Sequence, residues 1–343
     1  MSWLRRNSLI LLILAALVMG WLTPEWGANG GRLHSELLIR IGVLLVFFFQ
    51  GFNLSTRSLI DGIKFWPLHL FTQFWIFVGI PCIALMGLYF AGDALSDGEK
   101  LGLFFLSVLP TTISSAVILV GHAGGNVAGS IFNTAFSNLA AVFIMPAWIV
   151  GFQSNLSGVE IDGWAVFLNL VKLLLVPFLV GHLSRPFLHR WEQGILRASK
   201  IANPWIIGFI VYAAFATSFR DQVWVQVGSE VAIRSLVASV GLLVVVSMLI
   251  CSSARLVFKD ASNRIAAFFT GSQKSIAVGI PYSVAFFSTL SVAADPSLKQ
   301  SIIILPLLFY HPAQILLAGI FLHFQNFFFG ARITPKDAQL ISD

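Results

Sequence analysis

Long apolar runs alternate with short polar segments over most of this chain. A helix needs about 20 apolar residues to cross a bilayer, and ten runs approach or exceed that length. They are Ser8–Leu22, Leu37–Leu54, Phe65–Ala91, Leu101–Val120, Val127–Gly151, Gly163–Leu183, Pro204–Phe219, Val231–Leu256, Ile265–Leu290 and Ser301–Phe324. The pattern predicts an all-α polytopic membrane protein with ten transmembrane helices.

The composition supports this fold class. Hydrophobic residues make up 57% of the 343 residues and charged residues only 10%, whereas a soluble domain carries about a quarter charged residues. The net charge of +6 comes from basic residues spread over short loops. Because no basic and aromatic module accompanies them, the lipid bilayer is the expected partner and nucleic acid is not.

The distribution of Lys and Arg predicts the orientation. One set of alternate loops carries most of the 21 basic residues, which places both termini in the cytoplasm. An even number of spans requires the same arrangement. The expected location is a bacterial plasma (inner) membrane, with multiple passes. The first run follows Arg5 and Arg6 like a signal peptide, but no small-residue cleavage pattern follows it, so we expect a retained helix.

A cytoplasmic loop at about His182 to Asn203 divides the ten runs into two sets of five. An odd number per half means that the second half enters the membrane upside-down relative to the first, which is a recurring transporter plan. We therefore expect one transmembrane domain over residues 1–330, with inverted repeats at about 1–155 and 160–325. Residues 331–343 form a short cytoplasmic tail.

The residue types needed for enzymatic or metal chemistry are missing from the runs. No Asp or Glu lies well inside a span, which leaves no carboxylate for a proton relay within the bilayer. Cys82 and Cys251 have no metal-ligand or disulfide spacing and are expected to be small buried hydrophobes. No zinc-protease, nucleophile-elbow or Walker pattern is present either. The sequence therefore predicts a protein that is not an enzyme and has no resident cofactor.

Polar residues gather beside a proline in the fourth run. Pro110 frees backbone carbonyls, and four hydroxyl residues follow it: Thr111, Thr112, Ser114 and Ser115. Freed backbone groups at membrane depth are tolerated only beside protein or trapped water. The cluster therefore predicts a polar site, although hydroxyls that bond back to their own helix are an open alternative.

The ninth run has a second interruption. Gly271 is followed by Ser272, Gln273 and Lys274, with about ten apolar residues on either side. A lysine near the bilayer centre costs about 2.5–3.5 kcal/mol, so it should face a wet cavity or a cluster of acceptors. The alternative is a structural lysine that bonds the carbonyl oxygens of a broken helix.

Inverted symmetry would make these two interruptions, each in the fourth run of its half, cross each other. The fifth run adds a polar stripe at helical spacing, comprising Ser130, Asn133, Thr134, Ser137 and Asn138. Gln73 stands in the third run, eight residues before Pro81. Lys172 and His311 are weaker candidates; a packing role is favoured for the histidine.

Three segments resemble the bile acid:sodium symporter family, in particular its SBF-like branch, which includes member 7 of solute carrier family 10. They are Pro110-Thr-Thr-Ile-Ser-Ser, Gly124-Gly125-Asn126-Val127-Ala128 and Gly271-Ser-Gln-Lys-Ser. The resemblance covers nearly the whole chain. It implies ten helices in two inverted five-helix repeats that form a panel and a core, with helices four and nine broken and crossing in the core.

The resemblance also implies ligands for sodium. In sodium-coupled members, hydroxyls of helices four and five, a Glu and a Gln on helix nine, and a Gln on helix three bind two ions. The matching positions here are Ser114 or Ser115, Ser130, Thr134, Gln273 and Gln73. Two positions depart from the pattern, because Phe269 replaces the Glu and Lys274 replaces the Asn that follows the Gln.

We hypothesise that the Lys274 ammonium replaces one bound sodium and either holds an anionic substrate or titrates during the transport cycle. Sodium and the proton are the candidate coupling ions. The expected function is secondary active transport of a small organic anion. The alternative is a membrane regulator or scaffold with the same fold that transports nothing.

Overall fold

The computed structural model describes residues 8–112, 114–152, 162–287 and 298–330, and every element in this part of the chain is helical. The first half contains α2 Ser8–Leu22, α3 Pro24–Gly27, α4 Ser35–Asn53, α5 Thr56–Gly62, α6 Trp66–Phe74, α7 Ile80–Ala91, α8 Asp97–Val108, α9 Ser114–His122 and α10 Val127–Phe152. The second half contains α11 Gly163–Leu170, α12 Val176–Ser184, α13 Glu192–Arg220, α14 Val223–Val227, α15 Glu230–Val257, α16 Ala261–Ser272, α17 Ile276–Phe287, α18 Gln300–His323 and α19 Gln325–Phe329.

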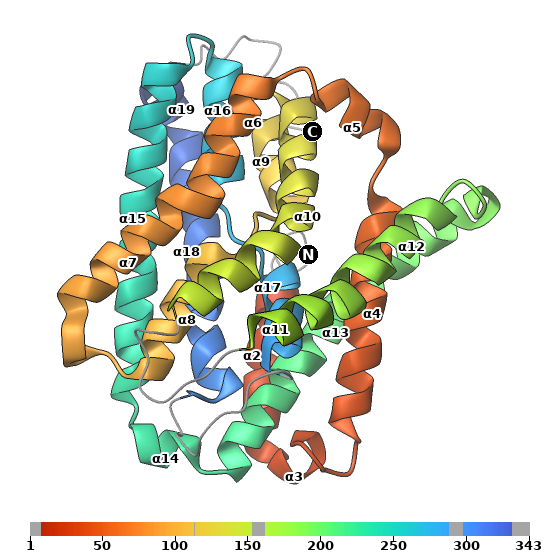
Figure 1. Cartoon of the computed structure of the whole chain (residues 1–343), viewed down its shortest axis with the longest axis vertical. Helices are drawn as coiled ribbons and strands as arrows, with labels where there is room; N and C mark the ends of the chain where they lie inside the picture. The colour runs from red at the N-terminus through yellow and green to blue at the C-terminus, as the bar shows by residue number, and fades with distance from the viewer. Residues whose placement is uncertain (1–7, 113, 153–161, 288–297, 331–343) are drawn as a thin grey trace.

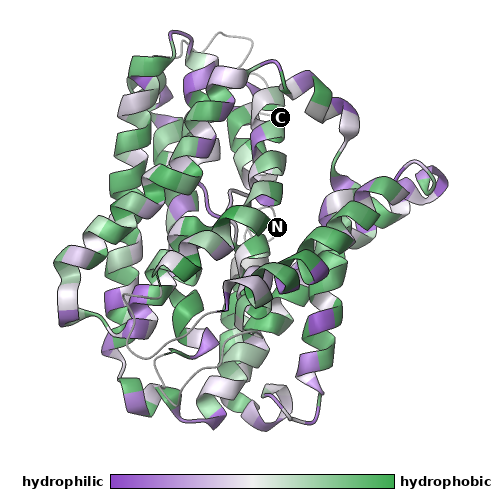
Figure 2. Ribbon diagram, in the orientation of Figure 1, coloured by the Kyte–Doolittle hydropathy of each residue, from purple (hydrophilic) through white to green (hydrophobic). Residues whose placement is uncertain are grey.

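Seven stretches in the described residues are long and apolar enough to cross a membrane: Ser35–Asn53, Trp66–Ala94, Val127–Phe152, Gly163–Ser184, His189–Arg220, Glu230–Val257 and Gln300–His323. Many large apolar side chains are exposed on these helices, and apolar residues dominate their ribbons (Figure 2). Such surfaces suit lipid rather than water, because acyl chains need no polar partners. The chain is therefore a multi-pass integral membrane protein.

The remaining three predicted spans are short or interrupted. The first is α2, which has 15 residues. The fourth is divided into α8 and α9, and the ninth into α16 and α17. The non-helical residues include Leu109–Thr112 in one case and Gln273–Ser275 in the other. The first interruption contains Pro110, and the second begins at Gln273, two residues after Gly271, which lies within α16.

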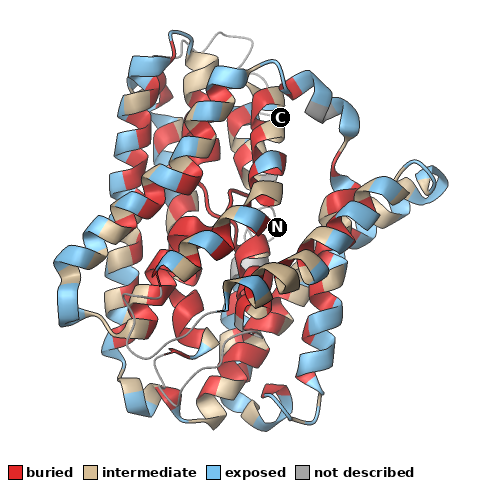
Figure 3. Cartoon of the chain, in the orientation of Figure 1, coloured by how far each residue is buried: buried red, intermediate tan, exposed pale blue. Residues whose placement is uncertain are grey.

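The helices pack in two groups (Figure 1). One group contains α2, α3, α4, α12 and α13, with α13 against α2 and α4 against α12. The other contains α6 to α10, α15, α16 and α18, with α18 between α8 and α15. Between the two groups, α13 contacts α17 and α18, and α11 contacts α10 and α17. Figure 3 shows that α8 is almost wholly buried, whereas α15 exposes its outer face.

Two helices of the first group approach with their backbones in contact. A side-chain carbon on Gly51 of α4 would collide with the carbonyl oxygen of Phe178 on α12. A side-chain carbon on Gly181 would likewise collide with the carbonyl oxygen of Phe48. Small residues of this kind allow helices to pack closely in membranes, so this pair of glycines fixes the distance between α4 and α12.

Two prolines are each preceded by a π-helical turn. The turns are Trp75–Gly79 before Pro81 and Val171–Leu175 before Pro177. Proline cannot donate to the carbonyl four residues earlier, which for Pro81 is the carbonyl of Phe77. The indole Nε1 of Trp148 donates to this oxygen at 2.8 Å, so a side chain of α10 satisfies it.

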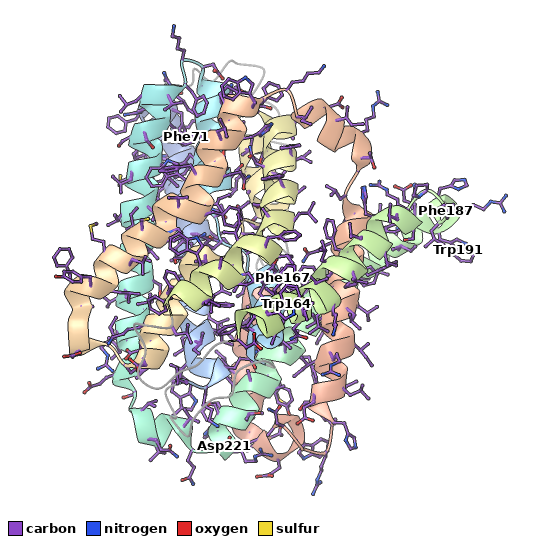
Figure 4. All side chains as sticks on the ribbon, in the orientation of Figure 1. Phe71, Trp164, Phe167, Phe187, Trp191 and Asp221 are labelled. Atoms are coloured by element: carbon purple, nitrogen blue, oxygen red, sulfur yellow. The ribbon has the colours of Figure 1, made fainter. Side chains whose placement is uncertain are left out.

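Two sequence-based expectations are wrong. The large cytoplasmic loop is shorter than predicted, because α13 already begins at Glu192. A helix with exposed Arg197 and Lys200 can continue beyond the apolar layer, so hydropathy alone places its start too late. Phe187 and Trp191 project from the remaining turn between α12 and α13 (Figure 4). Cys251 is buried as expected, whereas Cys82 is exposed on an outer helix face.

Candidate functional site

The ammonium of Lys274 lies where the two interrupted helices meet. Its Nζ donates to the carbonyl oxygens of Ser107 at 2.7 Å and Leu109 at 2.6 Å. A third acceptor is the carbonyl oxygen of Ile76, at 3.5 Å, in the π-helical turn before Pro81. Lys274 is only 1% exposed. One side chain thus joins the second interruption to the end of α8 and to the third predicted span.

The chemistry of this contact follows from how α8 ends. The last carbonyls of a helix lack intrahelical donors and form the negative end of its dipole. The helix stops at Val108 because Pro110 follows, and an ammonium has three hydrogens to donate. The geometry is that of a lysine bonding the carbonyls of a broken helix, which was one of the two alternatives predicted. The carbonyls belong to the other interrupted helix.

The second interruption is held by a residue that the sequence analysis did not select. The side-chain Oε1 of Gln314 on α18 accepts from the backbone N–H of Lys274 at 2.8 Å. Its Nε2 donates to the backbone carbonyl of Lys274 at 2.9 Å. The hydroxyl of Tyr310, on the same helix, donates to the carbonyl oxygen of Ser272 at 2.8 Å. A glutamine within an apolar run was the available signal for this role.

The hydroxyl residues after Pro110 form hydrogen bonds of their own and do not bond to the Lys274 ammonium through their described side chains. The Oγ of Ser115 donates to the Oγ1 of Thr112 at 3.1 Å. The carbonyl oxygen of Thr111 accepts from the Nδ2 of Asn138 on α10 at 3.1 Å. The side chain of Ser114 lies outside the described part of the structure. The hydroxyls of Thr112 and Ser115 therefore bond to each other, and it is backbone carbonyls that meet Lys274.

The polar stripe of α10 is buried and connects to both sides. Ser130 shares a hydrogen bond of 2.8 Å with Thr270 of α16. The Nε2 of Gln73 donates to the Oδ1 of Asn133 at 3.0 Å. Thr134 turns its hydroxyl to the carbonyl of Ile131 in its own helix. The stripe thus contacts α16 and the third predicted span, while Thr134 contributes no bond between helices.

Among the described residues, four buried oxygens around the two interruptions have no protein partner. They are Gln73 Oε1, Thr111 Oγ1, Asn138 Oδ1 and Gln273 Oε1. Buried polar atoms are rarely left unpaired in proteins. Three of the four are amide oxygens and can only accept, so they suit a ligand or an ion with donor or positive character.

Phe269, which the resemblance aligns with an acidic sodium ligand, is packed among other aromatic rings. Phe269 is fully buried and its ring lies 5.0 Å from that of Phe268 and 6.0 Å from that of Phe329. This packing leaves the site with neutral oxygens and one ammonium. No group of three or more His, Cys, Asp or Glu residues is positioned to hold a metal within the described ranges.

The weaker candidates are also placed. Lys172 is exposed on its helix, outside this site. His311 is 7% exposed, and its Nδ1 lies 2.9 Å from Gln314 Nε2. Gly125 and Gly129 pack against Ile265 and Leu68, where a side-chain carbon would lie 2.6 and 2.7 Å from the neighbouring atoms.

An ion pair with a buried carboxylate, which the sequence analysis missed, anchors the start of α8. Glu99 is fully buried and accepts from Arg234 of α15, with Oε1 to Nε at 2.8 Å and Oε2 to Nη2 at 3.2 Å. Glu99 also closes a capping box with Ser96. The first half of the interrupted helix is therefore fixed at one end by this pair and at the other by Lys274.

The sequence of the chain is similar to those of known membrane transporters. The family model of the SBF-like CPA transporter family matches residues 7–325. Sodium/bile acid cotransporter 7 of Danio rerio is 28% identical over 321 residues, which is 93% of each chain. Putative symporter YfeH of Escherichia coli (strain K12) is 29% identical over 285 residues, 83% of each chain. Sodium/bile acid cotransporter 7 of Mus musculus is 28% identical over 319 residues, 92% of this chain and 91% of its own.

Proposed function

Because the chain belongs to the SBF-like CPA transporter family, whose members are transporters and not enzymes, we propose that it is a secondary active transporter of a small organic anion. The observation that carries this proposal is the meeting of two interrupted helices at the Lys274 ammonium. Discontinuous helices that cross near the bilayer midplane form the substrate and ion sites of many transporters. The positive charge of the Lys274 ammonium attracts an anionic solute through space, while its hydrogens are donated to backbone carbonyls.

The proposed architecture has ten helices in two inverted repeats, at about residues 1–155 and 160–325, within one domain that ends near residue 330. The interruptions then belong to the fourth helix of each repeat. The group of α2, α4, α12 and α13 is proposed as the panel, and the group with α8, α10, α15 and α18 as the core. Both termini lie on the cytoplasmic side of a bacterial plasma membrane in this proposal, with residues 331–343 as a tail.

The proposed site comprises residues of both interruptions, of α10 and of the third span. It includes Gln73, Thr111, Thr112, Ser114, Ser115, Ser130, Asn133, Thr134, Ser272, Gln273 and Lys274. In this proposal the Lys274 ammonium stands in for one bound cation, since it is bonded to the carbonyls of Ser107 and Leu109. Phe269 replaces the acidic ligand, so a second cation would depend on the neutral oxygens of Ser114, Ser130, Thr134 and Gln273.

Uptake into proteoliposomes tests the transport function. The purified protein is reconstituted and offered a mixture of carboxylates, sulfonates and steroid conjugates, with accumulated solutes identified by mass spectrometry. We expect saturable uptake of an anion that is driven by a proton gradient, with little response to sodium. Strict sodium dependence together with unaffected uptake by Lys274→Ala would contradict the role of Lys274. No uptake of any solute, with binding retained, would favour a regulator.

A gain-of-function variant tests the ion replacement independently of the substrate. The double variant Phe269→Glu, Lys274→Asn restores both residues that sodium-coupled members carry. We expect its thermal midpoint to rise with sodium concentration relative to potassium, whereas that of the unmodified protein stays constant, because a ligand that binds only the folded state stabilises it. An equal sodium response of both proteins would show that Lys274 replaces no cation.

A further inference from the structure

Gln314 makes a pair of hydrogen bonds to a single residue of the backbone. Its Oε1 accepts from the N–H of Lys274 and its Nε2 donates to the carbonyl of the same residue, at 2.8 and 2.9 Å. Gln314 is 1% exposed, so water does not compete with these bonds. The side-chain amide therefore contacts Lys274 in the same way as the backbone of a neighbouring β-strand would.

The backbone at this point needs such a partner. Gln273 has extended dihedral angles of φ −79° and ψ 135°, so α16 ends there and α17 begins only at Ile276. Buried backbone groups outside regular structure must find donors and acceptors elsewhere. A primary amide is the one uncharged side chain that offers both in one plane, and in the described structure Gln314 supplies it.

The orientation of this amide is set by a second residue of α18. The remaining hydrogen of Gln314 Nε2 faces Nδ1 of His311 at 2.9 Å. An amide nitrogen only donates, so Nδ1 accepts and the imidazole carries its proton on Nε2. With His311 protonated on Nε2, a flipped amide would place its oxygen against the lone pair of Nδ1 and against the Lys274 carbonyl, with no proton in either contact.

We propose that Gln314 is the positioning residue of Lys274, and that His311, in the tautomer protonated on Nε2, fixes the orientation of the Gln314 amide. The backbone of Lys274 is then held at a constant distance from the end of α8, and its side chain reaches the Ser107 and Leu109 carbonyls. The helix that carries both residues is suited to this role, since α18 packs against α8, α15 and α17. The link to transport rests on the proposed function; the positioning itself does not.

Acetylation of Lys274 by a membrane-permeant succinimidyl ester tests the positioning directly. The reaction requires a free amine, so an ammonium bonded to three carbonyls should react slowly. In Gln314→Leu we expect the rate at Lys274, followed by mass spectrometry of monodisperse protein, to rise about tenfold or more, because two hydrogen bonds that hold the segment are lost.

Three controls separate this effect from loss of fold. Gln325→Leu removes another buried amide, on α19, and should leave the Lys274 rate unchanged. The exposed Lys172 provides an internal reference and should react equally in all variants. His311→Leu should raise the Lys274 rate severalfold, whereas His311→Asn should restore it, because the Asn oxygen can accept at the place of Nδ1.

The outcomes are distinct. The proposal would be overturned if the acetylation rate of Lys274 in Gln314→Leu stayed within about twofold of that in the unmodified protein, since losing two buried hydrogen bonds should raise this rate. An equal rise of the rate in Gln325→Leu would also overturn it. Failure of His311→Asn to restore slow acetylation would remove the part assigned to His311. If the unmodified protein transports nothing but the acetylation pattern holds, the proposed function fails and the positioning stands.

Discussion

Each of the two interrupted helices leaves backbone groups without helical partners, but a charged side chain pairs with those of the first and a neutral side chain with those of the second. The first ends at a proline and leaves carbonyl oxygens at the end of α8, which accept from the charged Lys274 side chain. The second leaves both the N–H and the C=O of Lys274, which pair with the neutral amide of Gln314. The first interruption should therefore depend on a positive charge, and the second on the shape and orientation of a neutral group.

The largest effect is expected from Lys274→Met, which removes the charge and keeps most of the side-chain volume. The carbonyls of Ser107 and Leu109 then lose their donor, at about 1–3 kcal/mol for each buried group left unpaired. We expect uptake to be abolished and the free energy of unfolding in mixed detergent micelles to fall. Unchanged uptake in this variant would contradict the claim that the first interruption depends on a positive charge.

Asn138→Leu should have the next largest effect. Its Nδ2 donates to the carbonyl of Thr111 inside the first interruption at 3.1 Å, and the Oγ1 of Thr111 already has no protein partner. We expect a loss of about 1–3 kcal/mol in unfolding free energy. Asn53→Leu, at an exposed position, is the matched control and should lose much less. Equal losses would mean that the Thr111 carbonyl needs no donor.

A smaller effect is predicted for Tyr310→Phe, which removes the hydroxyl that donates to the carbonyl of Ser272. The expected loss is about 1 kcal/mol, as for one buried hydrogen bond. Tyr212→Phe removes a comparable bond, to the carbonyl of Thr23, far from both interruptions. Both variants should lose similar stability, but only Tyr310→Phe should accelerate acetylation of Lys274. Faster acetylation of Lys274 in both variants would show that the rate responds to a general loss of stability and not to the bond between Tyr310 and Ser272.

The smallest effect is expected from Lys172→Gln. This lysine also lies within an apolar run, but its side chain is exposed and outside the site. Uptake should be unchanged and stability should change by no more than about 0.5 kcal/mol, as is usual for exposed positions. A strong loss of uptake would mean that the charge of Lys172 acts on the solute despite its place on the outer face.

The sequence predicted the interruptions because polar residues follow a proline in one run and a glycine in the other. Proline alone is not sufficient, since Pro146, Pro204 and Pro281 lie within helices of this chain. The added signal was polar residues at membrane depth, where a lysine between two apolar flanks must find acceptors. The acceptors themselves were not predictable in the same way. Sequence patterns concern side chains, so they indicated the hydroxyls after Pro110. The atoms that bind Lys274 are backbone oxygens, which every residue has and which no sequence pattern distinguishes.

The partners that were missed are defined by tertiary packing. Gln314 stands in an apolar run with His311 three residues earlier, and neither residue shows from the sequence which backbone it will face. Glu99 and Arg234 are 135 residues apart, and each looks like an ordinary residue at a helix end. The start of α13 at Glu192 was missed for a related reason, since hydropathy marks where lipid ends and not where a helix does.

The glycines at the contact of α4 and α12 have a mechanical consequence. With Gly51 against the Phe178 carbonyl and Gly181 against the Phe48 carbonyl, neither helix can slide or rotate along the other without driving a neighbouring side chain into bare backbone. The helices α4 and α12 are therefore expected to move together as a rigid body in any conformational change. Any rearrangement that opens a path to Lys274 is therefore expected to leave the contact between α4 and α12 intact.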